Sequence, residues 1–203
     1  MKELVLASKS PRRREILQKA GLNFVIKKSD YEEELSNKIF TYEKIETLAK
    51  NKAFGALKNI KNPAYIIGAD TVVVYKNKIL TKPSDKNEAY STLRQLSGKT
   101  HIVVTGLCVL DSESQKYIIN STTTNVEFYP LTEEMIIKYV DKFNPMDKAG
   151  AYGIQELPEG YVKNVSGDIE NVIGLSSKAV MGSIKELETM LEESPTKFFY
   201  LQD

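Results

Sequence analysis

The sequence has few of the residues that build metal clusters, disulfides and histidine-dependent sites. Cys108 is the only cysteine among 203 residues, which excludes an intramolecular disulfide and a cysteine metal cluster. His101 is the only histidine, so a multi-histidine metal centre is excluded as well. Any bound metal must therefore be a hard cation held by oxygen atoms. The apolar neighbours of Cys108 predict a buried thiol in a strand, the alternative being a reactive thiol.

The chain has neither a large net charge nor a long hydrophobic run. Lysine and arginine number 28 against 27 aspartates and glutamates, so no overall basic field suggests nucleic-acid binding. No apolar run approaches about 18 residues, and the N-terminus enters a strand without a signal peptide. We therefore expect no membrane partner and a cytoplasmic location. The length suffices for one domain or for two small lobes that share a core.

Several well-known catalytic motifs are also absent. The chain has no G-x-x-x-x-G-K-[ST] loop, no G-x-G-x-x-G fingerprint and no G-x-S-x-G elbow. A serine triad would need His101, the only available histidine. Ser8 and Ser10 are therefore poor candidates for a nucleophile.

The hydrophobic pattern alternates strands with helices, which predicts an α/β or α+β domain with a mixed sheet. No repeat or linker composition divides the chain, so residues 1–203 are treated as one domain. Strands are predicted at 2–7, 24–28, 100–110, 116–128 and 161–165, with a hairpin turn at 76–78. Helices are predicted at 11–20 and after the caps Thr41, Ser84, Thr132 and Ser176.

The segment 8–14 combines a helix start with an unusual concentration of positive charge. Ser10 is suited to the N-cap and Pro11 to the first helical position. Three arginines follow at 12–14, where the positive end of the helix disfavours them unless an anion binds. Free N–H groups, hydroxyls and guanidinium groups could form a phosphate cradle. The alternative is a solvated basic turn.

A second polar interruption occurs at Asp70, inside the apolar run 65–75. An aspartate there is costly unless it is paired, hydrogen-bonded or exposed in a cleft. The alternative is that Asp70 lies in a turn between two strands. Lys52 likewise lies close to the apolar face of a helix, and its stem could simply run along that face to water.

These cations and carboxylates together suit a polyphosphate ligand with Mg²⁺ or Mn²⁺. The cations would balance the phosphate charge, and a carboxylate could hold metal or deprotonate a water. The candidate residues are the cations Arg12, Arg13, Lys52 and Lys82 and the carboxylates Glu33, Asp70 and Asp147.

Six motifs in this order resemble the Maf family of nucleoside triphosphate pyrophosphatases, over about residues 4–180. They are S-x-S-P-R-R at 8–13, G-A-D-T-V-V at 68–73, K-P at 82–83, G-K-x-H at 98–101, D-K-A-G-A-Y-G-I-Q at 147–155 and N-V-I-G-L at 171–175. The resemblance implies an elongated, inosine-triphosphatase-like α/β fold, with a mixed sheet flanked by helices and two lobes around a central cleft.

The resemblance also implies hydrolysis of a nucleoside triphosphate to the monophosphate and pyrophosphate, with a divalent cation. It favours the branch that acts on dTTP and UTP. The alternatives are the branch that acts on 7-methyl-GTP and a non-catalytic regulator that binds nucleotide or nucleic acid. A homodimer is one option for its assembly.

The resemblance assigns roles to individual positions. Asp70 matches the general base, and Glu33 an acidic position that would help Asp70 bind the metal. Positions of the phosphate site are matched by Ser8, Arg12, Arg13, Lys52 and Lys82. Positions that go with substrate choice are matched by Arg12, Thr71 and Gln155. Arg14 matches no such role. Glu156 and Ser176 depart from the family pattern, which usually has glycine and proline there.

Overall fold

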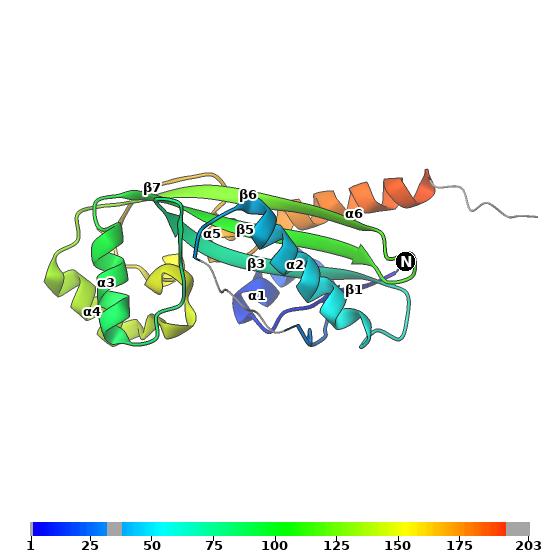
Figure 1. Ribbon diagram of the computed structural model, residues 1–203, viewed down its shortest axis with the longest axis horizontal. Helices are drawn as coiled ribbons and strands as arrows, with labels where there is room; N and C mark the ends of the chain where they lie inside the picture. The colour runs from blue at the N-terminus through cyan, green and yellow to red at the C-terminus, as the bar shows by residue number, and fades with distance from the viewer. Residues whose placement is uncertain (1, 32–37, 194–203) are drawn as a thin grey trace, which may run out of the picture.

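The computed structural model describes residues 2–31 and 38–193 and shows an elongated sheet with helices on both faces (Figure 1). Its strands are β1 (Glu3–Leu6), β2 (Val25–Ile26), β3 (Ala64–Tyr75), β4 (Lys78–Leu80), β5 (Thr100–Asp111), β6 (Tyr117–Phe128) and β7 (Val162–Ser166). Its α-helices are α1 (Pro11–Lys19), α2 (Tyr42–Leu57), α3 (Lys86–Leu96), α4 (Glu133–Phe143), α5 (Ile169–Ile173) and α6 (Ser177–Glu192). Three 3-10 turns follow α4: η1 (Pro145–Asp147), η2 (Ala149–Ala151) and η3 (Ile154–Glu156).

The sheet is mixed, as predicted. Its strands lie in the order β2-β1-β3-β5-β6-β7, with β4 beside β3. β1 is parallel to β2 and β3, whereas the other pairs are antiparallel. No helix in the described residues is long and apolar enough to cross a bilayer.

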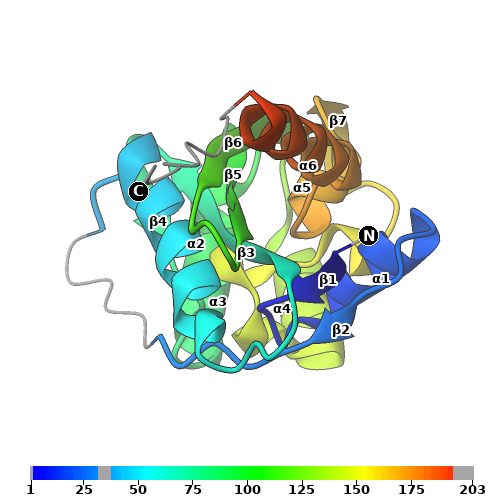
Figure 2. The same cartoon turned by 90° about the vertical axis from the view of Figure 1, so that its right-hand side faces the viewer.

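Alternation along β3 and β5 gives the sheet two buried faces. Ile66 and Cys108 lie in the core with the alanines of α2, on one face. Ile67 and Leu107 lie in the core with α1 and α6, on the other face. Figure 2 shows α2 on one side of the central strands and α1, α5 and α6 on the other. The buried Cys108 confirms the predicted strand thiol, and burial raises its pKa to about 12.

The long strands β3, β5 and β6 extend from this first lobe into a second one, where α3, α4 and the 3-10 turns form an end cap (Figure 1). Phe128, Tyr139 and Tyr152 are buried in the core of the second lobe. The cavity described below lies where the two lobes meet.

Two glycines allow α2 to lie directly on the sheet. A Cβ at Gly68 would lie 2.3 Å from the carbonyl oxygen of Ala49, and one at Gly106 would lie 2.5 Å from that of Ile45. Any side chain at these positions would push the helix away. The glycines therefore fix the height of α2, and with it the position of Lys52, above β3.

One edge of β3 is left open in the middle. β1 pairs with β3 only up to Ile67, and β4 pairs with it only from Val73 onwards. Residues 68–72 thus have no ladder with either strand on this edge. Asp70 and Thr71, which the sequence singled out, lie in this gap.

Most predicted element boundaries are confirmed. Ser10 caps α1, and Lys76 and Asn77 form the predicted hairpin turn with φ of 48° and 61°. The Asp70 turn is wrong, because β3 continues through residue 70 as a single strand. Ser84, the predicted cap of α3, precedes the residue that caps the helix, and its hydroxyl donates to Glu88.

Two further local features differ from the prediction. Asp85 caps α3, since its carboxylate accepts the N–H of residue 88 at 2.8 Å. The five-residue helix α5 was not predicted. Asp168 caps that helix.

Candidate active site

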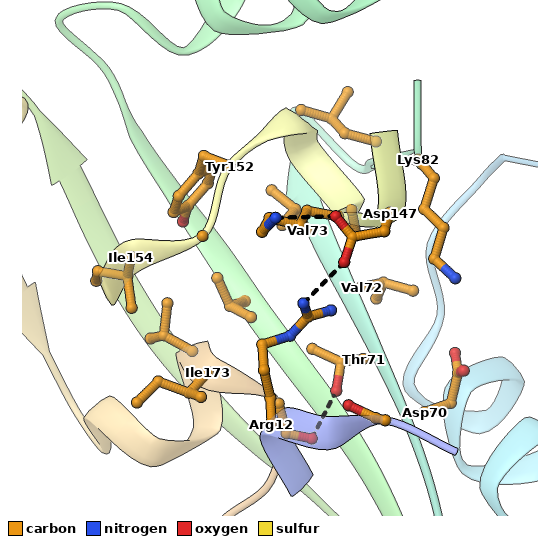
Figure 3. A pocket seen from close by; sticks show the side chains of 18 of the residues that line it. Arg12, Asp70, Thr71, Val72, Val73, Lys82, Asp147, Tyr152, Ile154 and Ile173 are labelled. Carbon is orange, nitrogen blue, oxygen red and sulfur yellow. Dashed lines mark hydrogen bonds and ion pairs between the residues drawn. The ribbon is translucent and has the colours of Figure 1, made fainter. Parts of the chain in front are cut away.

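A cavity of about 310 Å³ opens beside the unpaired edge of β3. Its walls come from seven parts of the chain: the start of α1, Lys52 of α2, residues 70–73 of β3, the end of β4, Val103 of β5, the 3-10 turns and the end of α5. Figure 3 shows the side chains of 18 of the residues that line it. The site therefore joins the two lobes and brings together segments from both ends of the sequence.

Asp70 lies on the α2 face of β3 and is only 6% exposed. Its carboxylate accepts a hydrogen bond from the ammonium group of Lys52. A buried carboxylate is stabilised by such a pair, because isolated burial of a charge is very costly. The alternative for Lys52, a stem that simply reaches water, is wrong: its head group lies at Asp70.

Arg13 points from α1 back to the sheet and is largely buried. Its Nε donates to the carbonyl oxygen of Gly174 at 2.9 Å, and its Nη2 donates to the hydroxyl of Thr71 at 2.9 Å. Its Nη1 donates to the hydroxyl of Ser8 at 3.3 Å. The guanidinium group is thus fixed by three separate segments of the chain.

The hydroxyl of Thr71 has only one proton but several neighbours. It lies 2.9 Å from the hydroxyl of Thr105 and 2.9 Å from the carbonyl oxygen of Gly174, in addition to Arg13. A hydroxyl donates once and accepts twice, so these contacts use most of its capacity. Thr71 therefore orients Arg13 within this network.

Arg12 points in another direction, across the cavity to the second lobe. Its Nη1 lies 3.0 Å from Asp147 Oδ2, and Lys148 Nζ lies 2.8 Å from Asp147 Oδ1. Partial burial raises the pKa of Asp147, but hydrogen bonds from Lys148 and Arg12 outweigh it and lower the pKa to about 2. Asp147 is therefore ionised at neutral pH. Arg14 is exposed and does not line the cavity.

The predicted phosphate residues are distributed over two adjoining cavities. Arg12 and Lys82 line the first cavity, and Ser8 lines a second one of about 520 Å³. Arg13 and Lys52 line both cavities. These two cations therefore stand where a long, anionic ligand would pass from one cavity to the other.

The first cavity has an apolar side and a charged side. In Figure 3, Tyr152, Ile154 and Ile173 lie on one side, and Asp70 and Lys82 lie on the other. Gln155 is exposed and lines the same cavity. Such a division suits a ligand with one flat, weakly polar end and one anionic end.

The family model for Maf-like proteins matches residues 3–187. The chain belongs to the Maf family. It is 45% identical over 175 residues to a dTTP/UTP pyrophosphatase of Alkaliphilus oremlandii, covering 86% of this chain and 91% of that protein. It is 42% identical over 187 residues to a dTTP/UTP pyrophosphatase of a Geobacillus species, covering 92% of this chain and 99% of that protein.

Two solved structures show a weak similarity to this Maf protein. A nucleoside-triphosphatase / dITP/XTP pyrophosphatase from Mycobacterium abscessus is 13% identical, with a TM-score of 0.44 and coverage of 94% of this chain and 96% of that chain. A HAM1 protein from Coxiella burnetii is 17% identical, with a TM-score of 0.43 and coverage of 96% and 100%.

The metal ligands predicted for this Maf protein are Glu33 and Asp70. Glu33 lies outside the described residues. Among the residues that the structure describes, no three aspartate, glutamate, cysteine or histidine side chains form a metal cluster. One or two carboxylates together with phosphate oxygens are a common donor set for Mg²⁺. The carboxylate of Asp70 at the cavity thus fits a divalent cation that arrives with a triphosphate.

Sequence reasoning missed several residues that shape the cavity. The carbonyl group of Gly174 binds both Arg13 and Thr71, and Thr105 completes that network. Lys148, largely buried, fixes Asp147. Gly174 belongs to the motif N-V-I-G-L and Lys148 to the motif D-K-A-G-A-Y-G-I-Q, so both could have been singled out from the sequence. Thr105 lies in an apolar strand without any such pattern.

Proposed function

We propose that this Maf protein hydrolyses dTTP and UTP to the monophosphate and pyrophosphate. The observation that carries the proposal is the buried Asp70–Lys52 pair at a cavity that Arg12, Arg13 and Lys82 surround. Relatives that are 40–46% identical over most of the chain bear the name dTTP/UTP pyrophosphatase. We expect the protein to act in the cytoplasm, where such nucleotides occur.

The apolar side of the cavity suits the nucleoside end of the substrate. Tyr152, Ile154 and Ile173 offer apolar surface for a base, and the Gln155 amide can both donate and accept. A pyrimidine such as thymine or uracil presents a matching N3–H and carbonyl edge. A hydrogen-bonding site of this kind discriminates strongly, because a wrong base leaves polar groups unpaired.

The charged side of the cavity suits the triphosphate and the attacking water. In the proposed reaction, the Asp70 carboxylate takes a proton from water, and the water oxygen attacks the α-phosphorus. The bond from that phosphorus to the bridging oxygen then breaks, and pyrophosphate leaves with the electron pair. Arg13, Lys52 and Lys82 offset the negative charge that develops on the leaving group.

A divalent cation fits this chemistry as the partner of the carboxylates. Asp70, together with Glu33, would hold Mg²⁺ or Mn²⁺, whose charge neutralises the phosphate oxygens. We expect a chelator to abolish turnover and added Mg²⁺ or Mn²⁺ to restore it.

The test is a panel of nucleoside triphosphates with Mg²⁺ or Mn²⁺, in which monophosphate, pyrophosphate and orthophosphate are each measured. We expect dTTP and UTP to give monophosphate and pyrophosphate, and Asp70→Asn to abolish the reaction. Release of orthophosphate, a preference for 7-methyl-GTP, or nucleotide binding without turnover would each overturn the proposal. Near-normal turnover by Asp70→Asn would overturn the role of Asp70.

A further inference from the structure

A row of four alternating charges runs from the wall of the cavity into the second lobe. Arg12 Nη1 lies 3.0 Å from one oxygen of Asp147, and Lys148 Nζ lies 2.8 Å from the other. Lys148 Nζ also lies 3.3 Å from Glu156 Oε2. The row joins α1 of the first lobe to η1 and η3 of the second, and in Figure 3 Arg12 and Asp147 face one another across the cavity.

The second-lobe end of this row is held in place by packing. The Lys148 side chain is 9% exposed, and Gly153 is so close that a Cβ there would lie 2.9 Å from Lys148 Cε. Glu156 holds the same ammonium group from the other side and accepts a hydrogen bond from Tyr139 at 3.4 Å. Asp147 is therefore anchored to a nearly immobile cation.

The first-lobe end is less constrained. The Arg12 side chain is 28% exposed, and among the described residues Asp147 is the hydrogen-bond partner of its guanidinium group, through Nη1 alone. A long arginine side chain samples many rotamers when it is not held. The contact with Asp147 selects one of them and leaves the other edge of the guanidinium group facing the cavity.

We propose that Asp147 is a positioning residue that holds Arg12 between the base and the phosphates of the nucleotide, and thereby contributes to substrate choice. This inference rests on the proposed function. The pair of Arg12 with Asp147 is partly exposed, and such a pair contributes little to folding stability, so the effect of breaking it falls on ligand recognition rather than on the fold.

The experiment is a double-mutant cycle with Asp147→Asn and Arg12→Ala. We expect Asp147→Asn to lower kcat/KM for dTTP about fivefold, mostly through KM, and to narrow the preference for dTTP over GTP. In the Arg12→Ala background the same change should have less than about a twofold effect, because the interaction is already lost. Thermal unfolding should show both variants folded.

The matched control is Glu133→Gln, which breaks another arginine–carboxylate pair, that of Arg94 with Glu133 at 2.7 Å, on the surface of the second lobe. It should leave kcat/KM and the nucleotide preference unchanged. Equal effects of Asp147→Asn in both backgrounds, or equal losses on every nucleotide, would overturn the positioning role.

Binding separates this inference from the proposed function. The dissociation constant of α,β-imido-dTTP should rise about fivefold in Asp147→Asn, whether or not the wild-type protein turns over dTTP. Equal affinity of the wild-type protein and the variant for this analogue would refute the positioning role alone. Absence of turnover with intact binding would refute the pyrophosphatase proposal alone.

Discussion

The ammonium group of Lys52 contacts the carboxylate of Asp70 at the point where α2 crosses the open edge of β3. The two residues come from different elements, and Gly68 sets how closely these elements approach. A carboxylate that is to accept a proton needs a fixed position as well as a partner for its charge. The pair supplies both.

Replacement of Lys52 by methionine should therefore lower kcat for dTTP about 100-fold or more, since it removes a cation from both the carboxylate and the phosphates. Steady-state kinetics of purified protein would measure this. Lys50→Met is the matched control, because Lys50 lies on the same helix but donates to Tyr117 Oη at 2.8 Å, away from the cavity. Similar losses in both variants would contradict a specific role for Lys52.

The arginines 13 and 14 offer a second comparison within one helix. Arg13→Lys should raise KM for dTTP about tenfold or more, because a lysine cannot reproduce the three contacts with Gly174, Thr71 and Ser8. Arg14→Lys changes an exposed side chain and should leave KM unchanged. Equal KM values for the two variants would argue against the anchoring of Arg13.

Gly68→Ala should lower the free energy of unfolding by about 2 kcal/mol or more, because the new methyl group meets the backbone of α2. Gly182→Ala, in the open part of α6, should instead raise it by about 0.5 to 1 kcal/mol. Urea unfolding followed by circular dichroism would measure both changes. An unchanged free energy of unfolding in Gly68→Ala would mean that α2 can move away from the sheet without loss of stability.

His101 should make folding stability depend on pH in the acidic range. Burial lowers its pKa from 6.5 to about 4, so between these values the unfolded chain binds a proton that the folded protein does not. Its contribution is complete above pH 6.5 and falls as the pH drops towards 4, by about 3 kcal/mol in total.

Urea unfolding at pH 7.5, 5.5 and 4.5 would test this, with His101→Gln as the comparison. The wild-type protein should lose more stability than the variant over this range. Parallel losses in the two proteins would show that carboxylates alone account for the acid sensitivity.

Much of the fold could be predicted from the sequence, because its elements have strong local signals. Ser10 and Pro11 mark a helix start by their side chains alone, and the structure places the start of α1 there. The helix α5 was missed because five residues are too few to show a helical period. The break in apolar character at Asp70 suggested a turn, whereas tertiary pairing with Lys52 allows the strand to continue.

The site was only partly predictable for a geometric reason. Successive residues of a helix point about 100° apart, so the side chains of three neighbouring arginines cannot all point into the same site. Arg12 crosses the cavity, Arg13 turns to the sheet and Arg14 faces solvent. Asp147, the partner of Arg12, is 135 residues away in the sequence, and no local sequence pattern predicts such a contact.

The twelve-residue strands β3, β5 and β6 run from one lobe into the other as single elements. A hinge needs a short segment whose backbone can swivel, and three long, mutually hydrogen-bonded strands offer none between the lobes. The two lobes should therefore move together as one rigid body. Nucleotide entry and product exit then depend on side chains and short segments at the rim, and heat should melt both lobes in one cooperative transition.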